Sequence, residues 1–189
     1  MGHPMPTTKR RRVAALYYAT RDGQSRRIAE HISSHLAAKE VLAPPQDAAG
    51  TLPAPADLAA ASVVVLVAAV RYGRHLPAAE RFLVAYRSLR SPPPLALASV
   101  NLTARKPAKS TAAGNSYLGK LIARHRLAPA LAVAFAGRLD YPRYGWLDRQ
   151  IIRFIMLLTG GPTKPDTCVE YTSWRAVDEF AAQIADLSA

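Results

Sequence analysis

The segment Ser62–Val70, with the sequence SVVVLVAAV, constrains the fold of this chain more than any other part. It is apolar on both of the faces that an extended strand presents, so both faces must be buried. A strand is covered on both sides when helices lie on the two faces of a parallel sheet. The segment therefore predicts a central strand of a parallel sheet that lies between two layers of helices.

Strands and helices alternate along the rest of the chain, as such a sheet requires. Short apolar runs predict the strands, and apolar residues at helical spacing predict the helices. The predicted strands are 13–18, 95–100 and 131–137, with a weaker edge strand within 43–55, and the predicted helices are 26–39, 77–89, 116–125, 146–158 and 174–187. This order predicts an α/β fold with a doubly wound, parallel, five-stranded sheet and helices on both faces.

The length of 189 residues suits one domain with one good-sized core. Residues 1–11 are basic and have no apolar stretch, so we expect a disordered arm there and not a secretory signal. Residues 12–189 are expected to form a single domain. Cys168 is the only cysteine, which excludes an internal disulfide and a cysteine metal cluster and favours the cytoplasm. No group of histidines has zinc-ligand spacing, so no metal is expected.

Positive charge is concentrated in the middle of the chain. The net charge is +12, and residues 58–157 contain 15 Lys and Arg but only three Asp and Glu. The loops of this region are expected to form a positive surface that suits phosphates, carboxylates or anionic lipid. A nucleic acid would also fit the charge, but no recognised nucleic-acid-binding motif accompanies it, so no such partner is expected.

Three predicted loops follow strands at one edge of the sheet, where doubly wound folds bind ligands. The first, Thr20–Ser25, offers hydroxyls, a glycine and the amides of a helix N-terminus, which suit a phosphate. An ordinary helix start, capped by Asp22 or Ser25, is the alternative reading. The absence of GxGxxG and GxxxxGK[ST] argues against a dinucleotide and a nucleoside triphosphate. In the second loop, Arg71–His75, Tyr72 is placed to flank a planar ring beside the Gly73 amide, and the third loop is Ser99–Pro107.

Several motifs together resemble the family of menaquinone-dependent protoporphyrinogen IX dehydrogenases. They are TRDGQ at 20–24, RYG at 71–73, SVNLxARKP at 99–107, NSY at 115–117, LxYPRYxWxDR at 139–149, and a GG that precedes YTxW at 171–174. The resemblance runs from about Val13 to the last residue. It implies a single flavodoxin-like FMN-binding domain that oxidises protoporphyrinogen IX in haem biosynthesis, with menaquinone or ubiquinone in the membrane as electron acceptor.

The resemblance also implies which residues bind FMN. They are Thr20, Arg21, Asp22, Gly23, Gln24 and Ser25 around the phosphate, and Arg71, Tyr72, Gly73, Ser99, Val100, Asn101, Leu102 and Arg105 around the ribityl chain and the isoalloxazine. Because the flavin performs the redox step, no catalytic side chain is assigned. Ser25 departs from the threonine expected in the family, and Arg74-His75-Leu76 replaces a more aromatic run that contains histidine.

The segment 138–158 exceeds what a minimal doubly wound domain needs. Arginines and aromatic rings complement a porphyrinogen with its propionates, so we expect substrate contacts from Arg105, Arg138, Tyr141, Arg143 and Tyr144. The helix predicted at 146–158 is too short to span a bilayer. Trp146, Arg149 and Arg153 beside its apolar residues favour contact with an anionic membrane surface, and a core helix is the alternative. The protein is therefore expected to be peripheral, at the cytoplasmic face of the inner membrane.

Two other functions are compatible with the same fold. A flavodoxin-type electron carrier that docks basic redox partners would be acidic, so the net charge of +12 argues against it. An NAD(P)H:quinone reductase would differ in being reduced rapidly by NADPH. The sequence gives no expectation for the oligomeric state.

Overall fold

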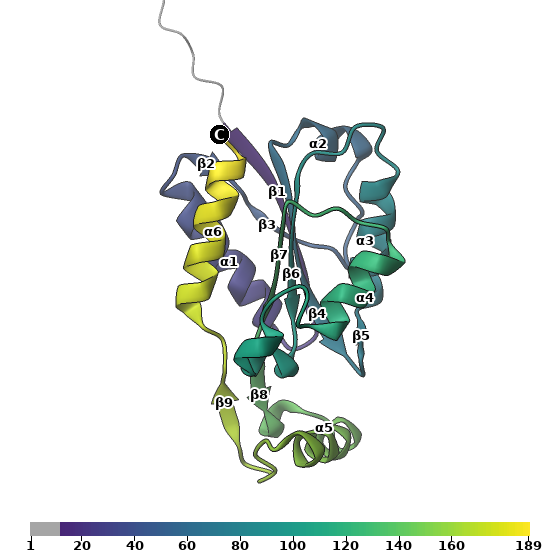
Figure 1. The fold of residues 1–189 in the computed structure, drawn as a ribbon, viewed down its shortest axis with the longest axis vertical. Coiled ribbons are helices and arrows are strands. Elements are labelled where there is room, and N and C mark those ends of the chain that lie inside the picture. The colour runs from purple at the N-terminus through teal and green to yellow at the C-terminus, as the bar shows by residue number, and fades with distance from the viewer. Residues whose placement is uncertain (1–11) are drawn as a thin grey trace, which may run out of the picture.

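A parallel sheet between two layers of helices forms the centre of the protein in the computed structural model, which describes residues 12–189 (Figure 1). Across the sheet the order is β2-β1-β4-β6-β7, and each neighbouring pair along this path is parallel. These strands are β1 (Arg12–Ala19), β2 (Val41–Leu42), β4 (Val63–Arg71), β6 (Leu95–Val100) and β7 (Leu131–Phe135). The predicted doubly wound, five-stranded sheet is confirmed. The predicted disordered arm, residues 1–11, lies outside the described residues.

Two short strands extend this sheet. β3 (Pro45–Asp47) pairs with β1 in the same parallel sense as β2, so the edge beside β1 is formed in two pieces. β5 (Arg74–His75) turns back antiparallel to the end of β4. The predicted edge strand within 43–55 thus corresponds to β3, which lies at the start of that range.

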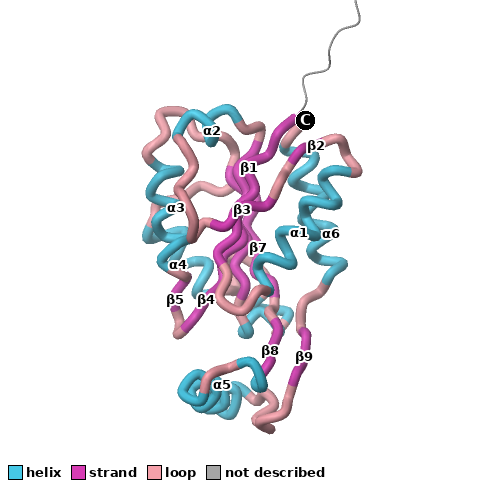
Figure 2. The backbone as a smooth tube through the Cα atoms, turned by 180° about the vertical axis from the view of Figure 1, so that it is seen from behind, coloured by secondary structure: helices cyan, strands magenta, loops and turns pink. Residues whose placement is uncertain are grey.

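The central strand β4 is buried on both faces, as its sequence predicts. Alternate side chains from Val63 onward pack into one core, and those from Val64 onward pack into a second core on the other face. The helices α1 (Gln24–Ala37) and α6 (Trp174–Leu187) cover the first face. The helices α3 (Pro77–Arg87) and α4 (Ser116–Arg124) cover the second, with α2 (Pro55–Ala60) at its end (Figure 2).

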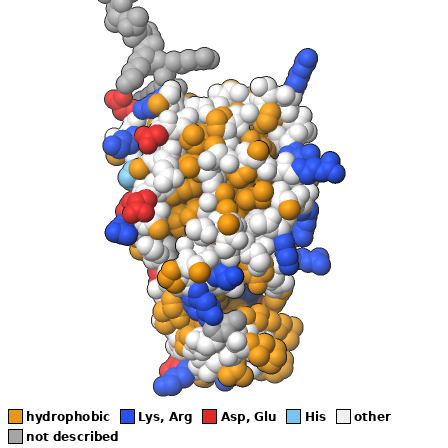
Figure 3. Space-filling view, viewed as in Figure 1, with side chains coloured by type: hydrophobic (Ala, Val, Ile, Leu, Met, Phe, Trp, Pro, Cys, Tyr) orange, Lys and Arg blue, Asp and Glu red, His pale blue; other side chains and the backbone are white. Residues whose placement is uncertain are grey.

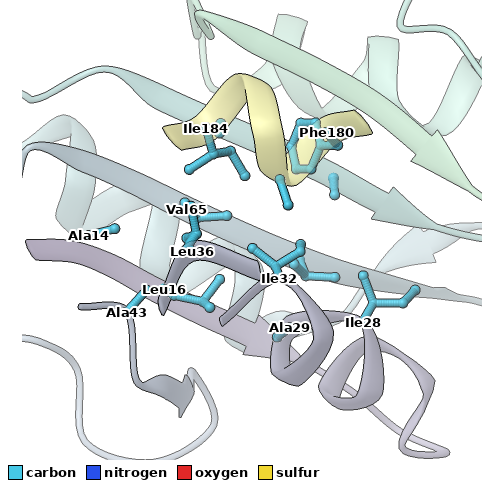
Figure 4. Close-up of a cluster of buried hydrophobic side chains, with 14 of the residues drawn as sticks. Ala14, Leu16, Ile28, Ala29, Ile32, Leu36, Ala43, Val65, Phe180 and Ile184 are labelled. Atoms are coloured by element: carbon cyan, nitrogen blue, oxygen red, sulfur yellow. The ribbon is translucent and has the colours of Figure 1, made fainter. Parts of the chain in front are cut away.

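The helices reach these cores through residues at helical spacing. Ile28, Ile32 and Leu36 lie one turn apart on α1 and are fully buried against Phe180 and Ile184 of α6 (Figure 4). Because i and i+4 side chains share a face of a helix, this stripe alone fixes which side of α1 meets the sheet. The packing holds the N-terminus of α1 at the carboxyl edge of the strands.

A separate lobe, residues 138–170, projects from this carboxyl edge (Figure 1). It contains β8 (Arg138–Asp140), the helix α5 (Trp146–Thr159) and β9 (Cys168–Glu170), and β8 pairs antiparallel with β9. We call it the α5 lobe. It has a small core of its own, formed by Leu139, Tyr141, Tyr144, Ile152 and Met156. No helix within residues 12–189 has the length and apolar character needed to cross a membrane.

Candidate functional site

A cleft of about 890 Å³, partly open to solvent, lies between the carboxyl ends of the strands and the α5 lobe. All three loops that the sequence singled out contribute to its lining, together with β8 and α5. The predicted site residues that line it are Thr20, Arg21, Asp22, Gln24, Ser25, Arg71, Tyr72, Gly73, Val100, Asn101, Leu102, Arg138 and Tyr144.

The first loop ends at an N-terminus of α1 that has no side-chain cap. Gly23 occupies the cap position with φ +90°, a left-handed conformation that favours glycine, and its amide donates to the Thr20 hydroxyl over 2.9 Å. No acidic residue lies in the first turn. The alternative prediction, that Asp22 or Ser25 caps this helix, is therefore wrong.

The same N-terminus holds a buried hydroxyl without a partner. Ser25 is fully buried, and its Oγ makes no hydrogen bond within the described residues. The first helical bond of α1 runs from the Arg27 amide to the Gly23 carbonyl, so the preceding amides have no acceptor within the helix. Free amides at a helix N-terminus and a buried hydroxyl donor fit the phosphate of a bound nucleotide.

The side chain of Gln24 is not available to a ligand, although Gln24 was predicted to bind the phosphate. Its Nε2 donates to Glu170 Oε1 and to Thr172 Oγ1, each over 2.8 Å, and its Oε1 accepts from Arg27. Of the polar groups of Gln24, only the backbone amide at the helix N-terminus is left for a ligand. The carboxamide instead joins α1 to β9, the returning strand of the α5 lobe.

Arg71, at the end of β4, joins the first loop to the α5 lobe. Its Nη1 donates to Asp22 over 3.1 Å and its Nη2 donates to Asp148 of α5 over 2.6 Å. The guanidinium also lies 5.1 Å from the ring centroid of Tyr144. Its Nε is buried without a hydrogen-bond partner within residues 12–189. The residue is thus held in place by two carboxylates and retains one unused donor.

The turn after Arg71 presents an aromatic ring at the mouth of the cleft. Tyr72 and Gly73 both have positive φ, +50° and +75°, which allows the tight reversal between β4 and β5. Tyr72 lines the cleft and is 55% exposed. A ring exposed beside a cleft is available to stack on a planar ligand.

The third loop is held in shape by a buried polar network centred on Asn101, which itself lines the cleft. Asn101 Nδ2 donates to Ser99 Oγ over 3.0 Å, and His75 Nε2 lies 2.9 Å from the same hydroxyl. Asn101 Oδ1 accepts from Thr103 and from Asn115. Burial lowers the pKa of His75 to about 4, so the imidazole is neutral at physiological pH. Ser99, predicted to contact FMN, does not line the cleft and instead supports the loop.

The predicted substrate residues have three kinds of placement. Arg138 and Tyr144 line the cleft, and Arg138 is paired with Asp140 over 3.0 Å. Tyr141 is fully buried in the core of the lobe, and its hydroxyl donates to the Pro162 carbonyl over 2.8 Å. Arg143 is exposed and Arg105 is half-buried, and neither lines the cleft. The structure thus gives Tyr141 a packing role, and none of these placements tests a contact with substrate.

The two arginines of α5 face the lobe and not the solvent side of the helix. Arg149 Nε donates to the Tyr141 carbonyl over 3.1 Å, and Arg153 Nε donates to the Thr163 carbonyl over 2.8 Å. Both were predicted to contact a membrane, but their guanidinium groups are used to hold the helix on the lobe. Trp146, the third residue of that prediction, is 74% exposed.

Sequence reasoning did not assign several residues that line the cleft. Ile152 and Ile155 of α5 are the most informative of them, because they place an apolar helix face at the cleft. The others are Ala69, Val70, Thr103, Tyr117 and Gly137. Thr103 and Tyr117 lie within the motifs SVNLxARKP and NSY, so those motifs carried a signal for them. Nothing in the sequence indicated which face of α5 would meet the cleft.

Comparison with known proteins gives consistent results. Residues 15–166 match the family model of the flavodoxin domain. A protein of Escherichia coli (strain K12) named protoporphyrinogen IX dehydrogenase (quinone) is 37% identical over 184 residues, which cover 92% of this chain and 94% of that protein. A protein of the same name from Leishmania major is 44% identical over 124 residues, covering 66% of this chain and 54% of that protein.

Solved structures of flavodoxins and related proteins share the fold. A flavodoxin from the domain Archaea superposes with a TM-score of 0.54 at 12% identity, covering 93% of this chain and 98% of that one. The rubredoxin oxygen:oxidoreductase of Desulfovibrio gigas gives a TM-score of 0.56 at 12% identity, covering 93% of this chain and 36% of that one. At this level of identity the likeness concerns the fold alone.

Proposed function

Given that the chain belongs to the flavodoxin-domain family of protoporphyrinogen IX dehydrogenases, which are oxidoreductases, we propose that it oxidises protoporphyrinogen IX with FMN as cofactor and a membrane quinone as acceptor. One observation carries the proposal. A single cleft joins a helix N-terminus suited to a phosphate with a lobe that supplies both arginine and apolar side chains. A carrier flavodoxin has no need of such a lobe, and the net charge of +12 also argues against that role.

The phosphate of FMN would lie at the N-terminus of α1. There Ser25 Oγ and the first amides of α1 donate to it, while Gly23 and Thr20 keep the loop in shape. The ring of Tyr72 would stack on the isoalloxazine, beside the loop that contains Asn101. When bound, FMN supplies the group that takes electrons from the substrate and passes them to the quinone.

The substrate would bind between the sheet edge and the α5 lobe. Arg138 provides a cation for a propionate at the side of the cleft, and Arg105 and Arg143 lie outside its lining, where they can meet groups that extend from it. The aromatic ring of Tyr144 forms part of the wall. Full conversion to the porphyrin removes six electrons and six protons, so about three quinones are reduced for each porphyrin formed.

We further propose that the protein is peripheral at the cytoplasmic face of the inner membrane, where a quinone acceptor is dissolved. The exposed Trp146 and the apolar side chains of α5 would enter the interface of the bilayer. The excess of positive charge in residues 58–157 would attract anionic lipid.

The proposal is tested anaerobically with the FMN-loaded protein, protoporphyrinogen IX and menadione. Fluorescent protoporphyrin should form only when the quinone is present, and three quinones should be consumed for each porphyrin. Arg138→Gln should raise the KM for the porphyrinogen, whereas Arg87→Gln, an exposed arginine on α3 away from the cleft, should not. Protein that is bleached by NADPH but inert to the porphyrinogen would be a quinone reductase. Protein that cannot be loaded with FMN would refute the proposal at its first step.

A further inference from the structure

The helix α5 carries its charges toward the protein and its apolar side chains toward solvent, the reverse of an ordinary surface helix. Asp148, Arg149 and Arg153 all bond to groups of the protein. The outer face of α5 is formed by large side chains that are between 61% and 74% exposed, namely Trp146, Leu147, Phe154, Leu157 and Leu158. Among the exposed side chains of α5 that the structure describes, only Gln150 is polar.

This outer face is visible as a gathering of hydrophobic side chains over the α5 lobe (Figure 3). A contiguous exposed apolar surface of this kind marks a site of interaction. The absence of charged side chains excludes the porphyrinogen as its ligand, because propionates require cations or hydrogen-bond donors. The ligand of this face must itself be apolar.

The outer face is continuous with the cleft. Ile152 lines the cleft and is almost fully buried, whereas Ile155 lines the cleft and is also 41% exposed. Leu158, three residues further, belongs to the outer face. Residues three apart are neighbours on a helix, so these side chains form an apolar path from the interior of the cleft to the surface.

We propose that this path binds the isoprenoid tail of the quinone acceptor while the quinone ring occupies the cleft. The inference rests on the proposed function, in which the acceptor is a membrane quinone. An isoprenoid chain has no hydrogen-bonding groups, so apolar side chains alone suffice to hold it. With the outer face at the bilayer, the tail leaves the lipid along α5 and the ring reaches the cleft without the tail crossing water.

The test compares naphthoquinone acceptors that differ only in their tails, in buffer free of lipid and detergent. The series is menadione, which has no tail, and its analogues with one and two isoprene units. For the wild-type holoenzyme, the KM should fall at least about tenfold from menadione to the longest tail, because each buried methylene strengthens binding about fourfold and burial of about two methylenes already gives that factor. In Phe154→Glu and Leu158→Glu this fall should be lost, while kcat and KM with menadione stay as in wild type.

A matched control is Val84→Glu on α3, which makes the same kind of change at a valine that is 61% exposed and far from α5 in the fold. It should keep the full dependence on tail length. A second readout is independent of turnover. In a Trp174→Phe background, Trp146 is the remaining tryptophan, and its fluorescence should be quenched at lower concentrations by the tailed quinones than by menadione.

Each other outcome overturns the inference. A wild-type KM that does not depend on the tail, or glutamate variants that keep the dependence, would show that the tail does not lie on α5. If the glutamate variants lost the dependence only when lipid vesicles were added to the same assay, the outer face would contact lipid and not the tail. Failure of the proposed function has a different signature, since protoporphyrin would then form with none of the quinones.

Discussion

Replacing Ser25 with alanine should stabilise the cofactor-free protein while weakening its binding of FMN. Ser25 is fully buried, and its hydroxyl has no partner in the structure of residues 12–189. A buried polar group without a hydrogen bond costs about 1–3 kcal/mol. Alanine removes that cost and leaves a space of only one oxygen atom. The free energy of unfolding of the apoprotein should therefore rise by about 1 kcal/mol.

The effect on FMN has the opposite sign. A hydrogen bond to a charged group contributes about 1.5–3 kcal/mol, so loss of the Ser25 donor should raise the Kd of FMN by about 10- to 100-fold. The Kd is measured by quenching of flavin fluorescence, and the stability of the apoprotein by urea unfolding. Both need buffer without phosphate, because inorganic phosphate would compete for the helix N-terminus.

Ser34→Ala is the matched control. Ser34 lies on the same helix, but its hydroxyl is exposed and donates to the Glu30 carbonyl. This substitution should change neither the Kd nor the stability by more than about 0.5 kcal/mol. If Ser25→Ala instead destabilised the apoprotein and left the Kd unchanged, the hydroxyl would have a structural partner, and the phosphate site would have to lie elsewhere.

Three other perturbations test the buried polar network around His75, the segment between β6 and α4, and the α5 lobe. Burial lowers the pKa of His75 to about 4, below its unfolded value of about 6.5. Between these two pH values the unfolded chain therefore binds more protons than the folded protein does. The free energy of unfolding should fall by roughly 3 kcal/mol as the pH falls from 6.5 to 4. His75→Gln should flatten this dependence in urea unfolding, and an equally steep curve would contradict the assignment. Gly114→Ala would place its Cβ 1.9 Å from the Ala108 carbonyl oxygen, so it should lower the free energy of unfolding by about 1–3 kcal/mol, and an unchanged Tm would argue against this close approach. Arg71→Met removes the partner of Asp22 and Asp148, so amide exchange in α5 should accelerate while that in α6 does not, and equal rates in both proteins would show that the lobe is held by other contacts.

The sheet and the loops at its edge could be predicted because their signals are local. The apolar run of β4 identifies a strand buried on both faces, and parallel strands bring their following loops together at one edge. The conformation of the first loop, which leads into Ser25 at the N-terminus of α1, follows from that topology and from the glycine at position 23. The resemblance to a known family supplied the remaining residues that are predicted to bind the cofactor.

The α5 lobe could not be predicted in the same way. β8 and β9 have three residues each and pair across an intervening helix, so neither has a local pattern of its own. The apolar sequence of α5 suits a membrane face as well as a core face, and its arginines were therefore predicted to contact a membrane surface. Hydrogen bonds from Arg149 and Arg153 to distant carbonyls decide the orientation, and such contacts have no counterpart in helical periodicity.

The pairing of Arg138 with Glu170 brings together the two points at which the chain leaves the central sheet with its helices and returns to it. The Tyr171 amide continues this ladder by donating to the Gly137 carbonyl, so the two chain segments are also hydrogen-bonded where they join the sheet and its helices. An insertion whose two ends lie side by side does not require the surrounding strands to move, so its length and sequence can change without disturbing them. The lobe can therefore change in size as one unit while the strand order of the sheet stays the same. Sequence change confined to α5 can then alter the outer face of this helix without displacing the N-terminus of α1 or the loops at the sheet edge.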